Sequence, residues 1–335
     1  MVPLAAALGL GLAVVYVLRV LIRPVAFLIL GITLAEALAP IVERLARRMS
    51  RTLAVTIVFL GLAIVVGVLA WVVLPPLVAQ AQELGEQAPQ LIDRGRALFQ
   101  HWDQRLGGQA SRFMGQLIQQ IGSGLVGVPL AVVSGLINLL VVIFLSIYWL
   151  LGSPSLLRFT LSFFPERRRP RTEQVLHDMG QAMGGYVRGA AINAVIMGAL
   201  AWIGLTLLGV KYALALGVLT MLGEPIPYLG PLLAAIPVVC VALLQSVTKA
   251  LLAIVLYSGL QQFEGHLLTP NIMKSQTHVP QALVIFALVA GAAVGGLLGV
   301  LVALPLAGAL RVFVLEVVAP WVRRRMGAPP EHDVA

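Results

Sequence analysis

The sequence predicts an all-α polytopic membrane protein with about eight transmembrane helices, two of its apolar segments broken by glycine and proline. Composition is the first reason, because 59% of the 335 residues are hydrophobic and 11% are charged. Soluble domains carry about 25% charged residues. The second reason is length, since several apolar runs reach the roughly 20 residues that a helix needs to cross a bilayer. No alternating strand pattern competes, so backbone groups in lipid would be paired within helices.

Apolar windows predict the individual helices. The first two windows are nearly continuous and are separated by "RVLIRP", where Pro24 suits the first turn of the second helix. The predicted spans are 4–22, 24–42, 53–75, 125–151, 190–208, an interrupted 212–248, 250–268 and 296–318. The chain then divides into 1–76 with helices one to three, 77–124 with an arm, 125–151 with helix four, 152–187 with a basic loop and amphipathic helix, 188–318 with the broken helices, and 319–335 as a tail.

The segment 77–124 differs from its neighbours, because charged residues and glutamine rise sharply and no window is apolar enough to span. Apolar residues recur at helical spacing on both sides of Gly107-Gly108 and predict an amphipathic helical arm between helices three and four. They are Leu91, Leu98, Trp102, Leu106, Phe113, Leu117 and Ile121. The apolar face of this arm would pack on the bundle, on another subunit or on the lipid interface.

Arginines cluster in two predicted loops and in the tail. Pro154, Pro165 and Pro170 indicate a loop over 152–172, after which Thr172 would cap an amphipathic helix. Because basic residues mark cytoplasmic loops, we expect both termini in the cytoplasm and the arm outside. The clustered residues are Arg44, Arg47, Arg48, Arg51, Arg158, Arg167, Arg168, Arg169, Arg171, Arg323, Arg324 and Arg325. Because these arginines lie beside apolar runs, we interpret the net charge of +9 as a signal for membrane orientation and contact with anionic lipid, rather than for nucleic-acid binding.

Two apolar segments in the second half are interrupted. The stretch 212–222 has about half the length needed to cross, and "GEPIPYLGP" at 223–231 then stops the helix. Pro280 opens a second apolar stretch, which the glycine-rich "GAAVGG" at 291–296 interrupts. Broken backbone at membrane depth is tolerated only inside protein or beside a water-filled cavity. Paired breaks therefore indicate a transporter's substrate site, while the alternative is a pair of kinks that only shape the bundle.

The breaks and the helix end after 250 supply the candidate substrate or ion site. Glu224 is the central candidate, since a carboxylate within a bilayer is costly and would bind a cation or carry a proton. Its alternative role is to cap the half helix at the membrane surface. Glu264 and Gln261 could share one helix face near the end of a span. The full set is Glu224, Pro225, Pro227, Tyr228, Gly230, Pro231, Gln261, Glu264, Gly291, Gly295, Gly296 and Gly299.

Four further residues are secondary candidates. Glu36 lies within the second predicted span and would pair with a basic group on another helix. Arg188, near the start of the fifth span, would anchor at headgroups, form a salt bridge or contact substrate. His266 could sense pH, and Asn271 lies close to it in the sequence. Each of these also has a plain structural reading as a surface or packing residue.

The second half resembles the AI-2E family of transporters, also called the PerM or UPF0118 family. The resemblance rests on "YVRG" at 186–189, "LLGVKYA" at 207–213, "IPYLGP" at 226–231 and "IP" at 236–237. It continues over the later segment, where the matching residues are Glu264, Pro270, Pro280, Gly291, Gly296, Gly299, Pro305 and Leu306. The likeness is sharp over 185–318 and extends in hydropathy over most of 1–318.

This resemblance implies a permease of the bacterial inner membrane that moves a small polar solute by secondary transport. Family members are described as exporters of the quorum-sensing signal autoinducer-2 or as sodium(lithium)/proton antiporters, and a homo-oligomer, with the pentamer as one form, is implied. No cofactor, metal or enzymatic activity is expected, because HExxH, GxSxG and GxxxxGK[ST] motifs are absent from the sequence. The alternative function is a membrane scaffold that assembles neighbours through the amphipathic arm.

Overall fold

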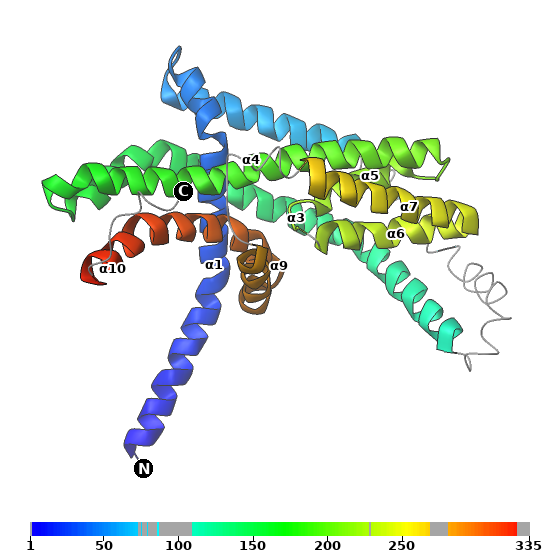
Figure 1. The fold of residues 1–335 in the computed structure, drawn as a ribbon, viewed down its shortest axis with the longest axis horizontal. Helices are drawn as coiled ribbons and strands as arrows, with labels where there is room; N and C mark the ends of the chain where they lie inside the picture. Colours follow the sequence, from blue (N-terminus) through cyan, green and yellow to red (C-terminus); the bar gives the residue numbers. More distant parts are fainter. Residues whose placement is uncertain are drawn as a thin grey trace. The chain divides into compact units, whose positions relative to one another are not determined.

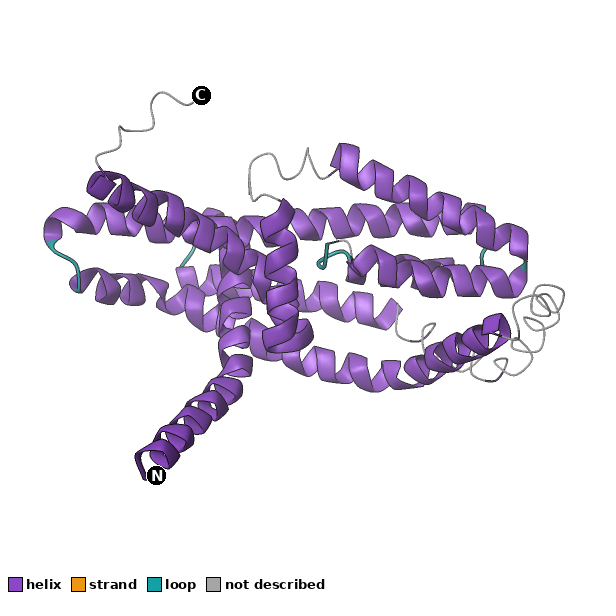
Figure 2. Ribbon diagram, turned by 60° about the horizontal axis from the view of Figure 1, so that its bottom comes forward, coloured by secondary structure: helices purple, strands orange, loops and turns teal. Residues whose placement is uncertain are grey.

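The computed structural model describes residues 2–72, 109–227, 229–268 and 281–326, together with positions 75, 79 and 86. Regular structure in these ranges is helical throughout (Figure 2). Helices long and apolar enough to cross a membrane are Val20–Ala46, Arg51–Val72, Ile137–Ser162, Glu166–Leu207 and Ala282–Met326, and shorter apolar helices are Ala213–Gly223 and Leu229–Leu243. The predicted all-α, multi-pass class is therefore confirmed for the described residues, while the number of eight spans stays a prediction.

The first helix corrects the sequence prediction of two separate N-terminal helices. Helix α1 runs without interruption over Val2–Ala46 and contains both Pro24 and Pro40 (Figure 1). A proline inside a helix removes one backbone hydrogen bond, whereas ending the helix in apolar surroundings would leave several backbone groups unpaired. Continuity is therefore the less costly solution at Pro24.

Helices α3 and α4 are also longer than predicted. Helix α3, Gln109–Ser162, joins the second half of the arm to predicted helix four and continues past Pro154, where a loop was expected. A short 3₁₀ turn, η1 at Glu166–Arg168, precedes α4 at Arg169–Leu207. Thr172 thus lies inside α4 and is not its cap. The first part of the arm lies outside the described residues, apart from isolated positions.

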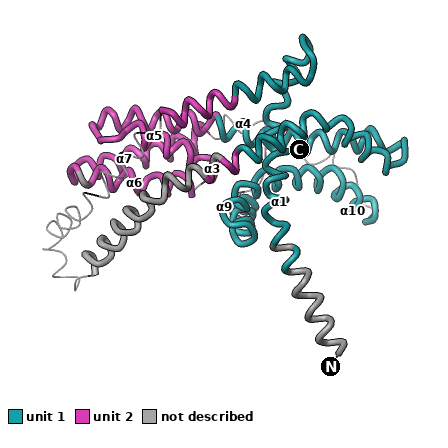
Figure 3. The backbone as a smooth tube through the Cα atoms, turned by 180° about the vertical axis from the view of Figure 1, so that it is seen from behind, with its two compact units in different colours: residues 1–61, 140–191, 270–335 teal, residues 62–139, 192–269 magenta. Residues whose placement is uncertain are grey.

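The chain forms two compact units, coloured separately in Figure 3. Unit 1 comprises Met1–Gly61, Leu140–Ala191 and Pro270–Ala335, and unit 2 comprises Leu62–Leu139 and Ile192–Thr269. Each unit is therefore assembled from segments that lie far apart in the sequence. Helices α3 and α4 each contribute residues to both units.

Unit 2 is organised around the first predicted break. Its later helices are α5 at Ala213–Gly223, α6 at Leu229–Gln245 and α7 at Val247–Phe263, followed by the π-helical turn η2 at Glu264–Leu268. Helix α6 packs against both α5 and α7. The buried core between these helices and α4 is rich in small residues, which let helix backbones approach closely. Fully buried examples are Ala201, Ala242 and Ala253.

Unit 1 contains the second predicted break, in α9 at Gln281–Phe313, which packs against α1. The π-helical turn η3 at Val314–Val318 and α10 at Ala319–Met326 follow α9. The backbone of α9 leaves helical geometry at one residue, Gly296, with φ 58° and ψ −137°. A Cβ atom on Gly291 or on Gly299 would overlap the backbone of the other, so the two limbs meet at these glycines. The break is narrower than predicted, since Gly291 and Gly295 are helical.

Candidate functional site

The first break is a compact turn between α5 and α6. At the end of α5, the Glu224 amide donates to the Thr220 carbonyl at 3.2 Å. At the start of α6, the Gly230 amide donates to the Ile226 carbonyl at 2.8 Å. The backbones of Gly223 and Gly230 are in close contact, because a Cβ atom on Gly230 would overlap the Gly223 carbonyl. The remaining predicted residues of the break divide as follows: Pro225 and Pro227 lie in the turn, Pro231 lies in the first turn of α6, and Tyr228 is outside the described residues.

Asn193 of α4 joins the carboxylates of Glu224 and Glu264. Its Nδ2 donates to Glu224 Oε2 at 3.0 Å and to Glu264 Oε1 at 2.8 Å. Glu264 comes from the π-helical turn that follows α7, so three separate helical elements of unit 2 meet at one amide nitrogen. The structure thereby brings together the two carboxylates that the sequence nominated separately.

Gln261 completes the cluster on the side of α7. Its Nε2 donates to Glu264 Oε2 at 3.3 Å, so these two side chains are in contact, and Gln261 itself is exposed. His266 is exposed and its Nδ1 lies 3.0 Å from the Gln262 carbonyl, so it belongs to its own helix surface rather than to the cluster. Asn271 lies outside the described residues.

Two oxygen atoms of the cluster lack a partner among the described residues. Glu224 is 4% exposed, yet its Oε1 accepts no hydrogen bond, and neither does the buried Oδ1 of Asn193. A buried acceptor without a donor is costly, and a buried negative charge is more so. Chemically, these two acceptors can take a hydrogen bond, and the carboxylate can also take a proton or coordinate a cation.

A second buried polar pair lies on the same helices. The hydroxyls of Thr220 on α5 and Tyr257 on α7 are 2.5 Å apart, and Thr220 Oγ1 also donates to the Leu216 carbonyl at 2.9 Å. Both side chains are buried, at 1% and 6% exposed. Thr220 precedes Glu224 by one helical turn, so a second buried polar contact lies next to the carboxylates on the same face of α5.

Sequence reasoning missed Asn193, Thr220 and Tyr257. Asn193 stands within the apolar part of α4, in "AAINAVIM". A polar amide in such a run is itself a signal, because it needs partners when it is buried. The signal does not name those partners, because Glu224 and Glu264 approach through tertiary folding.

Glu36 and Arg188 form a separate contact inside unit 1. Glu36 Oε1 accepts from Trp149 Nε1 at 3.1 Å, and Arg188 Nη1 donates to the carbonyls of Glu36 and Ala37 at 3.0 and 3.3 Å. Pro40 explains why the Glu36 carbonyl accepts from Arg188, since proline has no N–H to donate to the carbonyl one helical turn earlier. Arg188 therefore binds the backbone of α1, and the Glu36 carboxylate has Trp149 rather than the expected basic group as its partner among the described residues.

Two glycines of α4 allow this approach of α1. A Cβ atom on Gly184 would overlap the Glu36 carbonyl, and one on Gly180 would lie 2.9 Å from Glu36 Oε2. The small-residue pair at spacing four is typical of closely packed membrane helices. The predicted glycines of the second break also belong to unit 1, whereas the carboxylate cluster belongs to unit 2.

Comparison with known proteins places the chain in a family. The family described as "AI-2E family transporter" matches residues 6–319. The chain belongs to the AI-2E transporter family. Among its relatives is YrrI of Bacillus subtilis (strain 168), provisionally named a transport protein, which is 26% identical over 304 residues, 86% of this chain and 85% of that relative.

Two other AI-2E relatives extend the comparison. YueF of Bacillus subtilis (strain 168), also provisionally named a transport protein, is 28% identical over 298 residues, 83% of this chain and 80% of that relative. PerM of Escherichia coli (strain K12), provisionally named a permease, is 27% identical over 192 residues, 56% of this chain and 54% of that relative. The predicted resemblance is confirmed, and a multi-pass membrane protein from a family of transporters fits the helices described above.

Proposed function

We propose that this AI-2E family member is a secondary transporter whose ion or solute site is the cluster of Asn193, Glu224 and Glu264. The observation that carries the proposal is the shared amide nitrogen, which holds two carboxylates together while Glu224 Oε1 and Asn193 Oδ1 keep no donor. Two negative charges in a unit built of apolar helices require compensation. Ionisable groups placed in this way in membrane proteins commonly mark ion or substrate pathways.

The chemistry of the cluster favours a monovalent cation or a proton. Carboxylate and amide oxygens are ligands of hard cations, and the same carboxylates accept protons. Competition of a cation and a proton for one pair of carboxylates is the simplest basis of antiport. A small polar solute such as autoinducer-2 would instead donate hydroxyl hydrogens to the open acceptors, with export as the direction that the family resemblance implies.

The surrounding backbone supports a site within the membrane. Helix α5 has 11 residues, which span roughly 16 Å, about half of the hydrocarbon thickness. In the proposed arrangement the turn after α5 is re-entrant and lines the solute pathway within unit 2, and the break at Gly296 is a second re-entrant segment, in unit 1. The proposal includes the inner membrane, cytoplasmic termini and a homo-oligomer, the pentamer being one such form.

Flux measurements with the purified full-length protein in proteoliposomes test the proposal. An inward sodium gradient is imposed, and proton movement is followed with an internal pH-sensitive dye, with radiolabelled sodium uptake measured in parallel. We expect Glu224→Gln to abolish coupled movement, because the amide cannot release a proton or carry charge. Glu173→Gln, an exposed carboxylate on α4, is the matched control and should transport as the native protein does.

Undiminished sodium and proton flux in Glu224→Gln would remove the cluster from the mechanism. Absence of ion movement in the native protein, combined with uptake of autoinducer-2 that Glu224→Gln abolishes, would replace the ion by the polar solute at the same site. The scaffold alternative depends on the arm at 77–124, and the described residues provide no observation that favours it.

A further inference from the structure

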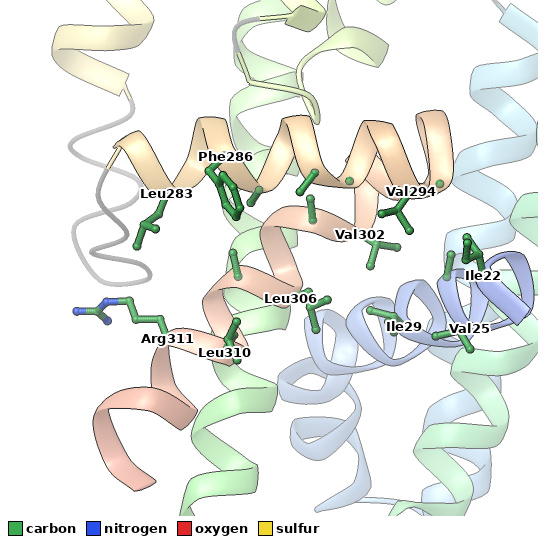
Figure 4. Close-up of a pocket in the computed structure, with 18 of the residues that line it drawn as sticks. Ile22, Val25, Ile29, Leu283, Phe286, Val294, Val302, Leu306, Leu310 and Arg311 are labelled. Carbon is green, nitrogen blue, oxygen red and sulfur yellow. The ribbon is translucent and has the colours of Figure 1, made fainter. Parts of the chain in front are cut away.

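Unit 1 contains a large apolar cavity between α1 and the two limbs of α9. Its volume is about 760 Å³, within the range of roughly 300–1,000 Å³ typical of ligand pockets. Figure 4 shows Ile22, Val25 and Ile29 of α1 at one end, with Leu283, Phe286 and Leu310 of α9 toward the other. Small residues, Ala287 and Ala290 among them, leave the space open.

Arg311 is the one charged residue among the described residues that line this cavity. Figure 4 places it at the end marked by Leu283 and Leu310, with its guanidinium directed away from the apolar lining. Within the described ranges no hydrogen bond or ion pair of Arg311 is found. The nearby acid of the same chain segment, Glu316, pairs instead with Arg171 at 3.1 Å.

We propose that this cavity binds one anionic phospholipid, with an acyl chain between α1 and α9 and the phosphate on the Arg311 guanidinium. The apolar lining of the cavity suits a hydrocarbon chain, and the cation at its end suits an anionic headgroup. Guanidinium groups bind phosphate through parallel N–H donors. This site is distinct from the carboxylate cluster and does not depend on the transported solute.

The bilayer is the expected source of the occupant. Helix α9 and the second part of α1 are candidate membrane spans, so an apolar hollow between them borders on lipid acyl chains at high local concentration. An unpaired arginine within such a segment is costly unless it reaches an anionic partner. Basic pockets between membrane helices are known binding places for anionic headgroups. A flexible acyl chain also fills an irregular cavity without requiring a matching protein surface.

Native mass spectrometry of the delipidated full-length protein tests this site. The protein is titrated with phosphatidylglycerol and, separately, with phosphatidylcholine of the same acyl chains. We expect one phosphatidylglycerol per chain to bind at least about tenfold more tightly than phosphatidylcholine, because the choline cation of phosphatidylcholine offsets the phosphate charge and repels the Arg311 guanidinium. Arg311→Gln should reduce phosphatidylglycerol affinity to that of phosphatidylcholine. Arg167→Gln, an exposed arginine before α4, is the matched control and should leave both affinities unchanged.

A second variant tests the acyl-chain part of the site. Ala307 lines the cavity one helical turn before Arg311, so Ala307→Phe should weaken the binding of both lipids by occupying the space of the chain. Equal affinity for the two lipids in the native protein would overturn the proposal, as would unchanged phosphatidylglycerol binding in Arg311→Gln. Loss of an oligomer in Ala307→Phe with lipid binding unchanged would assign the cavity to a second copy of the chain and also overturn it.

Discussion

Glu224 and Glu264 are held together by one nitrogen atom. Asn193 Nδ2 donates to Glu224 Oε2 at 3.0 Å and to Glu264 Oε1 at 2.8 Å. Neither carboxylate has a basic residue as a hydrogen-bond or ion-pair partner among the contacts of the described residues. The Asn193 amide thus bridges the two carboxylates, as a lysine or arginine would in a salt bridge. Because the amide is neutral, the negative charge of the carboxylates remains available for a mobile cation or proton.

Removal of this amide should destabilise unit 2. In Asn193→Ala both carboxylates lose a charge-assisted donor, and we expect the free energy of unfolding to fall by roughly 2–3 kcal/mol. Thermal unfolding of the full-length protein in detergent, followed by tryptophan fluorescence, measures the change. Thr206→Val is the control on α4, since its exposed hydroxyl donates only within its own helix, to the Trp202 carbonyl. An Asn193→Ala protein as stable as this control would mean that the shared amide does not hold the carboxylates together.

The sequence was sufficient to predict the first break but not its tertiary partners. Pro225, Pro227 and the short apolar run before them predict where α5 ends, and the helix does end at Gly223. The approach of Glu264 to Glu224 depends on how α7 packs against α6, and hydrophobic periodicity does not determine which faces of two largely apolar helices meet. Asn193 was missed for the same reason.

Two prolines that predicted helix boundaries lie inside helices, and at Pro24 the apolar surroundings explain the difference. Pro24 and Pro154 were interpreted as helix boundaries, yet α1 and α3 continue through them. In water, a helix that ends can pass its backbone groups to solvent, whereas in lipid these groups have no other partner. The cost of one lost hydrogen bond then weighs less than the cost of an open helix end. Local composition alone does not show which of these two costs is smaller, because the answer depends on whether water or lipid surrounds the residue.

The contact of Arg188 with α1 should depend on Pro40. Arg188 Nη1 donates to the Glu36 and Ala37 carbonyls, and the Glu36 carbonyl is free because Pro40 offers no N–H. We expect Arg188→Gln to destabilise the native protein by about 1–3 kcal/mol. In a Pro40→Ala background the restored helical bond satisfies this carbonyl, so the same substitution should cost less. A double-mutant cycle measured by thermal unfolding gives the coupling energy, expected at 0.5 kcal/mol or more, about the smallest coupling typical of contacting residues. Additive effects of the two substitutions would show that the contribution of Arg188 to stability does not depend on Pro40.

The break in α9 should depend on the backbone freedom of one residue. Gly296 has φ 58° and ψ −137°, a conformation that residues with a Cβ atom rarely adopt, and a Cβ atom there would meet nothing within 4 Å. The cost of Gly296→Ala therefore comes from backbone strain alone, and we expect roughly 1–3 kcal/mol of destabilisation. Gly295→Ala is the neighbouring control, because Gly295 is helical and its Cβ atom would make an ordinary contact with Ile22 at 3.6 Å. That control should be neutral or stabilising by up to about 1 kcal/mol, since alanine favours the helix. Thermal unfolding in detergent compares the two proteins, and equal stability would show that the limbs of α9 do not require a glycine at position 296.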